Sequence, residues 1–211
     1  MRVPAVLPAV AVAVLLGGAL VFASGADPVA TYRQIVVGAL AWENLPDTLV
    51  WTVPLLGMTL AAAIPLRGGM VNLGGDGQLV IGGLVAALVP LALPGPGWIA
   101  MLLAVLLAML AAGAYAALAA WGEARHGVPL LISSLLLNYP AMGLASYLVG
   151  FPLRDVSSGL PQTVMIPPAA RLPALGGTLN AGALAIAAVA VLFVVFDRRA
   201  VAGYELRMRG L

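Results

Sequence analysis

The chain has 211 residues, of which 63% are apolar and 9% are charged, whereas about a quarter of an average soluble domain is charged. A soluble core of this size could not hide that much apolar side chain, so the composition predicts an integral membrane protein. The sequence has no cysteine and a single histidine, which excludes thiolate and zinc centres, and no lysine, which excludes a nucleotide-binding loop that depends on lysine. The net charge of +2 comes from few groups and does not indicate nucleic-acid binding. The residue types therefore predict no cofactor.

Charge-free runs predict the membrane spans, since a spanning helix needs about 20 mostly apolar residues. The first run has some features of a cleavable leader, but its apolar stretch is longer than a leader requires, so we expect a retained span. Prolines and glycines at 93–97 divide the long third run into two. Continuous rather than alternating apolar residues favour helices over barrel strands. The six predicted spans lie near residues 3–23, 48–66, 78–93, 98–120, 129–150 and 178–196.

The arginine residues predict the orientation of these spans. With the N-terminus inside, seven arginines are cytoplasmic (2, 67, 125, 198, 199, 207 and 209) and three are external (33, 154 and 171). This excess favours an N-in and C-in arrangement. The predicted fold is therefore one all-α polytopic bundle of about six transmembrane helices over residues 1–211. In the external segment 152–177 we expect a short interfacial helix or a partner contact.

Glycine supplies five of the twelve residues in the stretch 67–78, directly before an apolar span. The stretch has no Gly-Lys-Ser/Thr and lacks the dinucleotide glycine spacing, which argues against a phosphate loop. Two interpretations remain. The glycines permit close approach of helices in a cytoplasmic connection, or the stretch is a broken helix that enters the membrane and lines a cavity. Asp76 is isolated and cannot serve as a paired acid and base.

Polar residues interrupt the fifth span. Ser134 and Asn138 are four residues apart and therefore share one helix face, which should point away from lipid. They either form interhelical hydrogen bonds or line the path of a polar solute.

The last segment, 197–211, is the most charged part of the chain. It contains Asp197, Arg198, Arg199, Glu205, Arg207 and Arg209. By residue type alone, such a basic segment beside a membrane span favours binding to anionic lipid head groups.

Three segments in this order resemble the permease subunits of bacterial ABC importers for branched-chain amino acids, ribose-type sugars and nucleosides. They are Gly68-Gly-Met-Val-Asn72-Leu-Gly-Gly-Asp-Gly-Gln78, Gly127-Val-Pro-Leu-Leu-Ile-Ser-Ser-Leu-Leu-Leu-Asn138-Tyr139 and Gly203-Tyr-Glu-Leu-Arg207. Within this class the chain is most similar to nucleoside or simple-sugar permeases that work with basic-membrane-lipoprotein binding proteins. The resemblance covers about residues 25–211.

The resemblance implies a multi-pass protein of the bacterial inner membrane, paired with a second homologous permease subunit. It also implies an ATPase subunit that hydrolyses ATP on a separate chain, so this chain is not itself an enzyme, and a substrate-binding lipoprotein outside. The resemblance further implies that the segment 197–211 is a coupling segment that docks on the ATPase. The residues implied for coupling are Gly203, Tyr204, Glu205, Leu206, Arg207 and Gly210. We expect the substrate path to include Asn72, Gln78, Ser134 and Asn138.

Other functions fit the sequence less well. A membrane enzyme needs clustered acids, a histidine pair or an activated nucleophile. An ion-coupled secondary transporter usually carries charges within its spans, and these spans are charge-free. Permeases for sugars or for branched-chain amino acids remain alternatives within the family. Asp76 replaces the glutamate of many relatives, and family members continue beyond the coupling segment. We therefore expect that a chain ending at Leu211 is a fragment or a truncated product.

Overall fold

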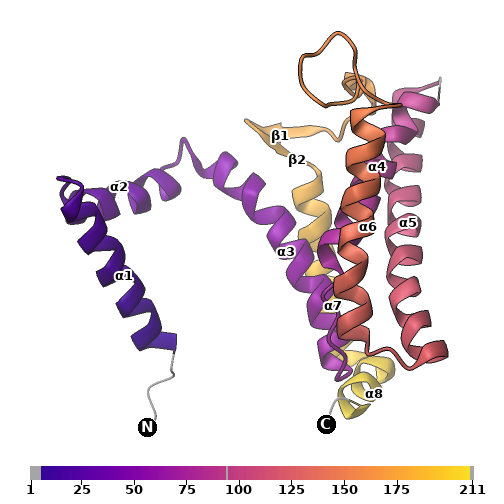
Figure 1. Ribbon diagram of the computed structural model, residues 1–211, viewed down its shortest axis with the longest axis horizontal. Helices are drawn as coiled ribbons and strands as arrows, with labels where there is room; N and C mark the ends of the chain where they lie inside the picture. The colour runs from indigo at the N-terminus through magenta and orange to yellow at the C-terminus, as the bar shows by residue number, and fades with distance from the viewer. Residues whose placement is uncertain (1–5, 94, 210–211) are drawn as a thin grey trace.

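The computed structural model describes residues 6–93 and 95–209, and most of them are helical (Figure 1). Residues 3–5 of the first predicted span, Pro94 of the predicted turn, and Gly210 of the predicted coupling segment lie outside the described residues. The helices are α1 (Val6–Ala23), α2 (Pro28–Leu40), α3 (Leu45–Arg67), α4 (Gly75–Ala92), α5 (Gly97–His126), α6 (Leu130–Gly150), α7 (Gly182–Arg199) and α8 (Val201–Arg209). A short 3-10 helix, η1 (Pro168–Ala170), and two strands, β1 (Ala174–Gly176) and β2 (Leu179–Asn180), complete the fold.

Small residues let α4, α5 and α6 pack closely into the main bundle. Ala104 and Ala119 of α5 are buried, and a Cβ built on Gly82 of α4 would lie 3.4 Å from the Cβ of Ala112. The Tyr115 hydroxyl of α5 donates a hydrogen bond of 2.6 Å to a backbone carbonyl of α6. On the other side of the bundle, α7 packs against α3. These close contacts need no large side chains, because dispersion and backbone proximity hold helices together in lipid.

Helices α1 and α2 form an arm that extends away from the bundle (Figure 1). Their axes are bent by 116° at the break between them. Asp27 begins α2 by accepting a hydrogen bond of 2.8 Å from the Val29 N–H, and Pro28 supplies the fixed φ of a first helical position. The Tyr32 hydroxyl of α2 donates to the Val14 carbonyl of α1 at 2.7 Å, which ties the two helices together.

The connection 151–181 lies at the opposite end of the bundle from α8 (Figure 1). We expected a short interfacial helix or a partner contact there. The segment forms the three-residue η1 and the antiparallel hairpin of β1 and β2. Its prolines explain why no longer helix forms in the described segment, because proline lacks an N–H and breaks helices. The Thr178 hydroxyl donates to Asp47 at 2.5 Å, and the hairpin is thereby attached to the first turn of α3.

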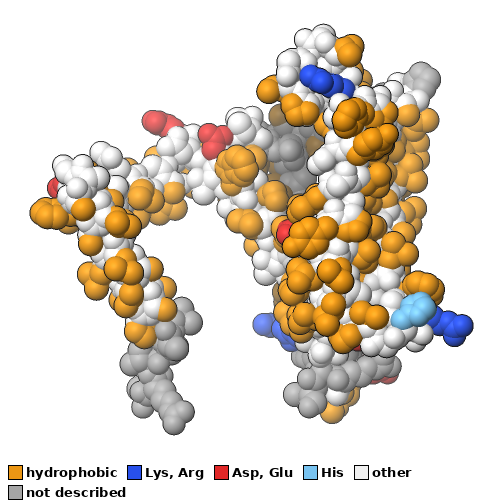
Figure 2. Space-filling model, viewed as in Figure 1, with side chains coloured by type: hydrophobic (Ala, Val, Ile, Leu, Met, Phe, Trp, Pro, Cys, Tyr) orange, Lys and Arg blue, Asp and Glu red, His pale blue; other side chains and the backbone are white. Residues whose placement is uncertain are grey.

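The all-α membrane fold predicted from the composition is confirmed. Among the described residues, the helices long and apolar enough to cross a membrane number four, α3 to α6, or five if α1 and α2 together make one bent span. Helix α7 occupies most of the sixth predicted span, but the hairpin shortens it, and its last three residues, 197–199, are charged. By this measure the number of spans is smaller than the predicted six. In Figure 2, hydrophobic side chains cover the sides of the helices and arginines gather toward the two ends.

Candidate functional site

The connection between α3 and α4 enters the bundle instead of staying at its end. Helix α3 stops at Arg67, where Gly69 adopts a φ of 73°, and residues 70–74 are not helical. The backbone of Leu73 then bonds to Ser134, and that of Gly77 bonds to Asn138. Asn138 follows the first residue of α6 by two helical turns, a distance of roughly 12 Å. Helix α4 therefore begins well inside the bundle, which agrees with the broken-helix interpretation of the glycine stretch.

Ser134 and Asn138 of α6 hold this non-helical segment through its backbone. The Ser134 Oγ accepts from the Leu73 N–H at 3.0 Å. The Asn138 side chain accepts from the Gly77 N–H at 2.8 Å and donates to the Leu73 carbonyl at 3.0 Å. The two side chains are only 1% and 7% exposed. An unpaired peptide group at membrane depth costs several kcal/mol, so these bonds make the break tolerable.

Two glycines allow α6 to approach so closely. A Cβ on Gly77 would lie 2.9 Å from the Oδ1 of Asn138 and 3.1 Å from its Cα, and a Cβ on Gly74 would lie 3.2 Å from the Cβ of Ser134. Because α4 has no side-chain cap of its own, Asn138 supplies from another helix the hydrogen bond that a local cap would provide.

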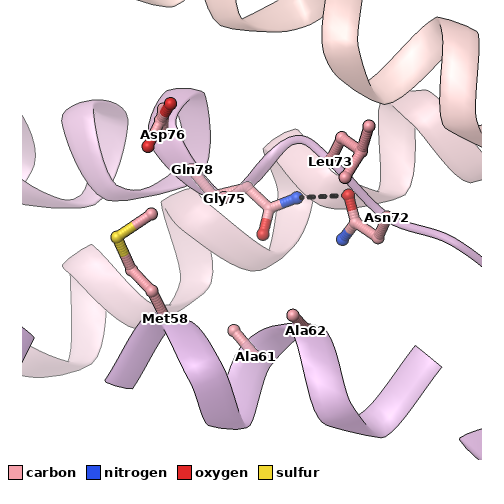
Figure 3. A pocket seen from close by; sticks show the side chains of 8 residues that line it. All are labelled: Met58, Ala61, Ala62, Asn72, Leu73, Gly75, Asp76 and Gln78. Carbon is pink, nitrogen blue, oxygen red and sulfur yellow. Dashed lines mark hydrogen bonds between the residues drawn. The ribbon is translucent and has the colours of Figure 1, made fainter. Parts of the chain in front are cut away.

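The other side of the break faces a cavity of about 200 Å³ between α3 and α4 (Figure 3). The Oδ1 of Asn72 accepts from the Gly74 N–H at 2.9 Å and from the Gln78 side-chain amide at 3.4 Å. The Asp76 carboxylate lies on the first turn of α4. The cavity is lined by Met58, Ala61, Ala62, Asn72, Leu73, Gly75, Asp76 and Gln78.

A second cavity, of about 440 Å³, adjoins the first. Met58, Ala61, Gly75 and Gln78 line both cavities. The remaining walls come from apolar residues and glycines of α3, α4 and α5, with Ile186 of α7. A polar opening next to a larger apolar one can take a solute that has both polar edges and an apolar face.

The structure divides the four residues expected on the substrate path into two pairs. Asn72 and Gln78 line the cavity and hydrogen-bond to each other. Ser134 and Asn138 lie behind the broken segment and bond to its backbone. Asp76, which we treated only as an isolated carboxylate, also lines the cavity. The sequence feature that could have placed Asp76 at the cavity is its position directly before Gly77 and Gln78, in the glycine-rich stretch.

Helix α8 lies at the end of the bundle where α3 stops and the broken segment begins (Figure 1). Gly203 is buried, and a Cβ there would collide with the Phe196 carbonyl at the end of α7. The Cδ1 of Leu206 lies 3.0 Å from the position of a Cβ on Gly68. Tyr204 is 57% exposed and Glu205 is also exposed. For Arg207 the structure describes only the helical backbone, and Gly210 lies outside the described residues.

An ion pair that the sequence did not reveal joins this end to α3. The Arg67 Nη1 lies 3.0 Å from one carboxylate oxygen of Asp197 and 3.2 Å from the other. The Asp197 side chain is 10% exposed and that of Arg67 is 46% exposed. The last residue of α3 is thereby linked to the end of α7, from which α8 continues. Within residues 6–93 and 95–209, no group of three His, Cys, Asp or Glu side chains is placed to hold a metal ion.

The helices and the re-entrant break define a multi-pass protein of the plasma membrane, built around a discontinuous helix beside a solute-sized cavity. The chain belongs to the family described as branched-chain amino acid transport system, permease component, whose model matches residues 44–211. No solved structure matches the chain significantly.

Three relatives carry more specific names. The chain is 33% identical to the glucose ABC transporter permease protein of Haloferax volcanii, over 94% of this chain and 56% of that protein. It is 29% identical to the guanosine ABC transporter permease protein of Bacillus subtilis, over 68% of this chain and 43% of the relative. It is 24% identical to the nucleoside ABC transporter permease protein of Lactococcus lactis, over 93% and 57%. These relatives are transport components and not enzymes, and the chain spans about half of their length.

Proposed function

We propose that this chain is a permease subunit of an ATP-driven importer that carries a nucleoside or a simple sugar across the plasma membrane. The observation that carries the proposal is the re-entrant break, which presents the Asn72 and Gln78 amides to a cavity beside a larger apolar one. Transporters commonly bind solutes where a helix is interrupted. Side-chain amides suit an uncharged polar solute, because they donate and accept hydrogen bonds without carrying charge.

The walls of the two cavities support alternating access as the transport mechanism. One wall comes from α3, through Met58 and Ala61, and the other from α4, through Gly75 and Gln78. The Ser134 and Asn138 hydrogen bonds attach the start of α4 to α6, so α4 and α6 would move as one body against α3. Relative movement of two such bodies would open the cavity to one side of the membrane at a time.

The proposed partners are an ATPase subunit, a second homologous permease subunit and an extracytoplasmic substrate-binding lipoprotein. The exposed side chains of Tyr204 and Glu205 on α8 would form part of the contact with the ATPase. Gly203 holds α8 against α7, and the Arg67–Asp197 pair connects that junction to α3. Movement imposed on α8 would therefore reach the cavity wall through α3. The basic residues of the tail would also contact anionic lipid head groups.

Uptake by intact cells of the source organism tests this function. Cells that lack the gene should lose uptake of radiolabelled guanosine or glucose, and the full-length gene should restore it. Gln78→Ala should lower the restored uptake, whereas Gln34→Ala, on the α2 arm, should not. Radiolabelled leucine is the third substrate to compare. Uptake that is independent of the gene, or gene-dependent uptake of leucine alone, would contradict the proposal.

A further inference from the structure

Asp76 differs from most other carboxylates of the described chain in having no hydrogen-bond or ion-pair partner there. Five others each accept a hydrogen bond or form an ion pair: Asp27, Asp47, Glu123, Asp155 and Asp197. Glu43 and Glu205 are exposed, as Asp76 itself is, but neither of them lines the cavity. Among the described residues, Asp76 is thus an exposed carboxylate without a partner, and its place in the lining of the cavity sets it apart.

Asp76 lies within α4, a candidate span, so the expectation that every span is charge-free is wrong at this position. The place of Asp76 along the bundle makes its lack of a partner informative. Its neighbour Gly77 bonds to Asn138, which lies roughly 12 Å along α6. A charge at such a depth is costly unless it faces a water-filled cavity, and charges kept there usually mark a solute path. The helix dipole favours a negative charge in the first turn of α4. It favours Asp47 in the first turn of α3 in the same way, so the dipole alone does not distinguish Asp76 from Asp47.

The groups around Asp76 define the chemistry of a ligand. The Nδ2 of Asn72 has no acceptor and the Oε1 of Gln78 has no donor among the described residues. The cavity therefore offers one amide donor, one amide acceptor and one carboxylate acceptor. Neighbouring hydroxyl groups could donate to Asp76 and Gln78 while accepting from Asn72. A phosphate or carboxylate group would instead be repelled by Asp76.

We propose that Asp76 is a specificity-determining residue of the solute path, which binds hydroxyl groups of an uncharged solute and excludes the phosphorylated form of the same solute. This proposal rests on the proposed function, because it assigns a role within that path.

The first experiment measures the selectivity of the cavity without relying on transport. Residues 1–211 contain no cysteine, so Ala62→Cys adds a single thiol to this part of the protein, on the cavity wall, and the unsubstituted transporter gives the background rate. In membranes that contain the assembled transporter, a cationic methanethiosulfonate reagent should modify this thiol faster than an anionic one. Asp76→Asn should reduce the ratio of the two rates about tenfold, since removal of one charge removes the local enrichment of cations. Asp47→Asn is the matched control and should leave the ratio unchanged.

The second experiment measures uptake by cells that carry the same variants. Asp76→Asn should raise the KM for guanosine or glucose about tenfold, because a hydrogen bond to a carboxylate is replaced by a weaker one to an amide. Asp76→Glu, which retains the charge, should recover most of the affinity. Guanosine 5′-monophosphate and glucose 6-phosphate should compete poorly with uptake by the wild-type protein.

The outcomes separate this inference from the proposed function. An unchanged reagent ratio and an unchanged KM in Asp76→Asn, with normal wild-type uptake, would overturn the role of Asp76 alone. A raised KM in Asp47→Asn of similar size would mean that the charge acts on the helix and not on the solute, which also overturns it. If deletion of the gene changes the uptake of no nucleoside and no simple sugar, the proposed function is rejected, and the solute specificity of Asp76 with it.

Discussion

The two sides of the α3–α4 break use polar side chains differently. On the α6 side, Ser134 and Asn138 are buried and bond to backbone groups of Leu73 and Gly77. On the α3 side, Asn72, Asp76 and Gln78 line a cavity and keep polar atoms without partners in the described chain. The comparison teaches that polar residues in a membrane helix have separable roles. Polar atoms paired with the backbone make an irregular segment tolerable, and unpaired polar atoms that face a cavity are available to a solute.

Valine in place of Gly77 should have the largest effect, because its side chain would collide with Asn138 and separate α4 from α6. We expect a destabilisation of about 3 kcal/mol or more, and little folded protein in the membrane. Fluorescence-detected size-exclusion chromatography would measure the folded fraction. Gly83→Val, on the same helix with open space around it, is the control. Equal yields of the two variants would show that the close contact with α6 is not required.

Alanine in place of Asn138 should destabilise the protein by about 2 kcal/mol, since it leaves the Gly77 N–H and the Leu73 carbonyl without partners. Asn72→Ala removes an amide from the cavity side and should lower uptake with a smaller loss of stability. Thermal unfolding in detergent, combined with uptake per folded molecule, distinguishes the two variants. The comparison between the two sides of the break fails if Asn72→Ala is the more destabilising change.

Glutamine in place of Arg67 should cost about 1 kcal/mol or less, because this arginine is 46% exposed and water screens its pairing with Asp197. Its clearer effect should be on coupling, seen as reduced solute-stimulated ATP hydrolysis by the assembled transporter. The exchange variant, Arg67→Asp with Asp197→Arg, should recover part of that stimulation. Normal stimulation in the single variant would exclude a coupling role for the pair.

The smallest effect concerns Asp155, a partly exposed and hydrogen-bonded carboxylate in the connection 151–181. Hydrogen bonds from the hydroxyl and the N–H of Ser157 lower the pKa of Asp155 below its ordinary value. A lowered pKa stabilises the local turn at neutral pH, and that stabilisation is lost as the pH falls through the pKa of the folded state. Amide hydrogen exchange of Ser157, corrected for intrinsic rates, should show less protection in acid. In Asp155→Asn this dependence on pH should disappear.

Local sequence signals predicted much of the fold. Charge-free runs located helices within about three to four residues at most of their ends, because hydropathy and length act within one segment. Asp27 followed by Pro28 was a usable signal for the start of α2, which we did not predict. The hairpin at 174–180 was missed because its strands are too short to carry a periodic pattern.

The sequence by itself determined that the chain is a membrane protein, that glycines interrupt the helical pattern after Arg67, and that Ser134 and Asn138 share a helix face. These properties depend on composition and on the helical repeat. Only the tertiary structure decided that this face hydrogen-bonds to the backbone of Leu73 and Gly77, 61 to 65 residues away in the sequence. It also decided that Arg67 pairs with Asp197, 130 residues away. The physical reason is that an amide or hydroxyl binds any peptide group equally well, so its partner is chosen by how the helices pack and leaves no pattern in the sequence.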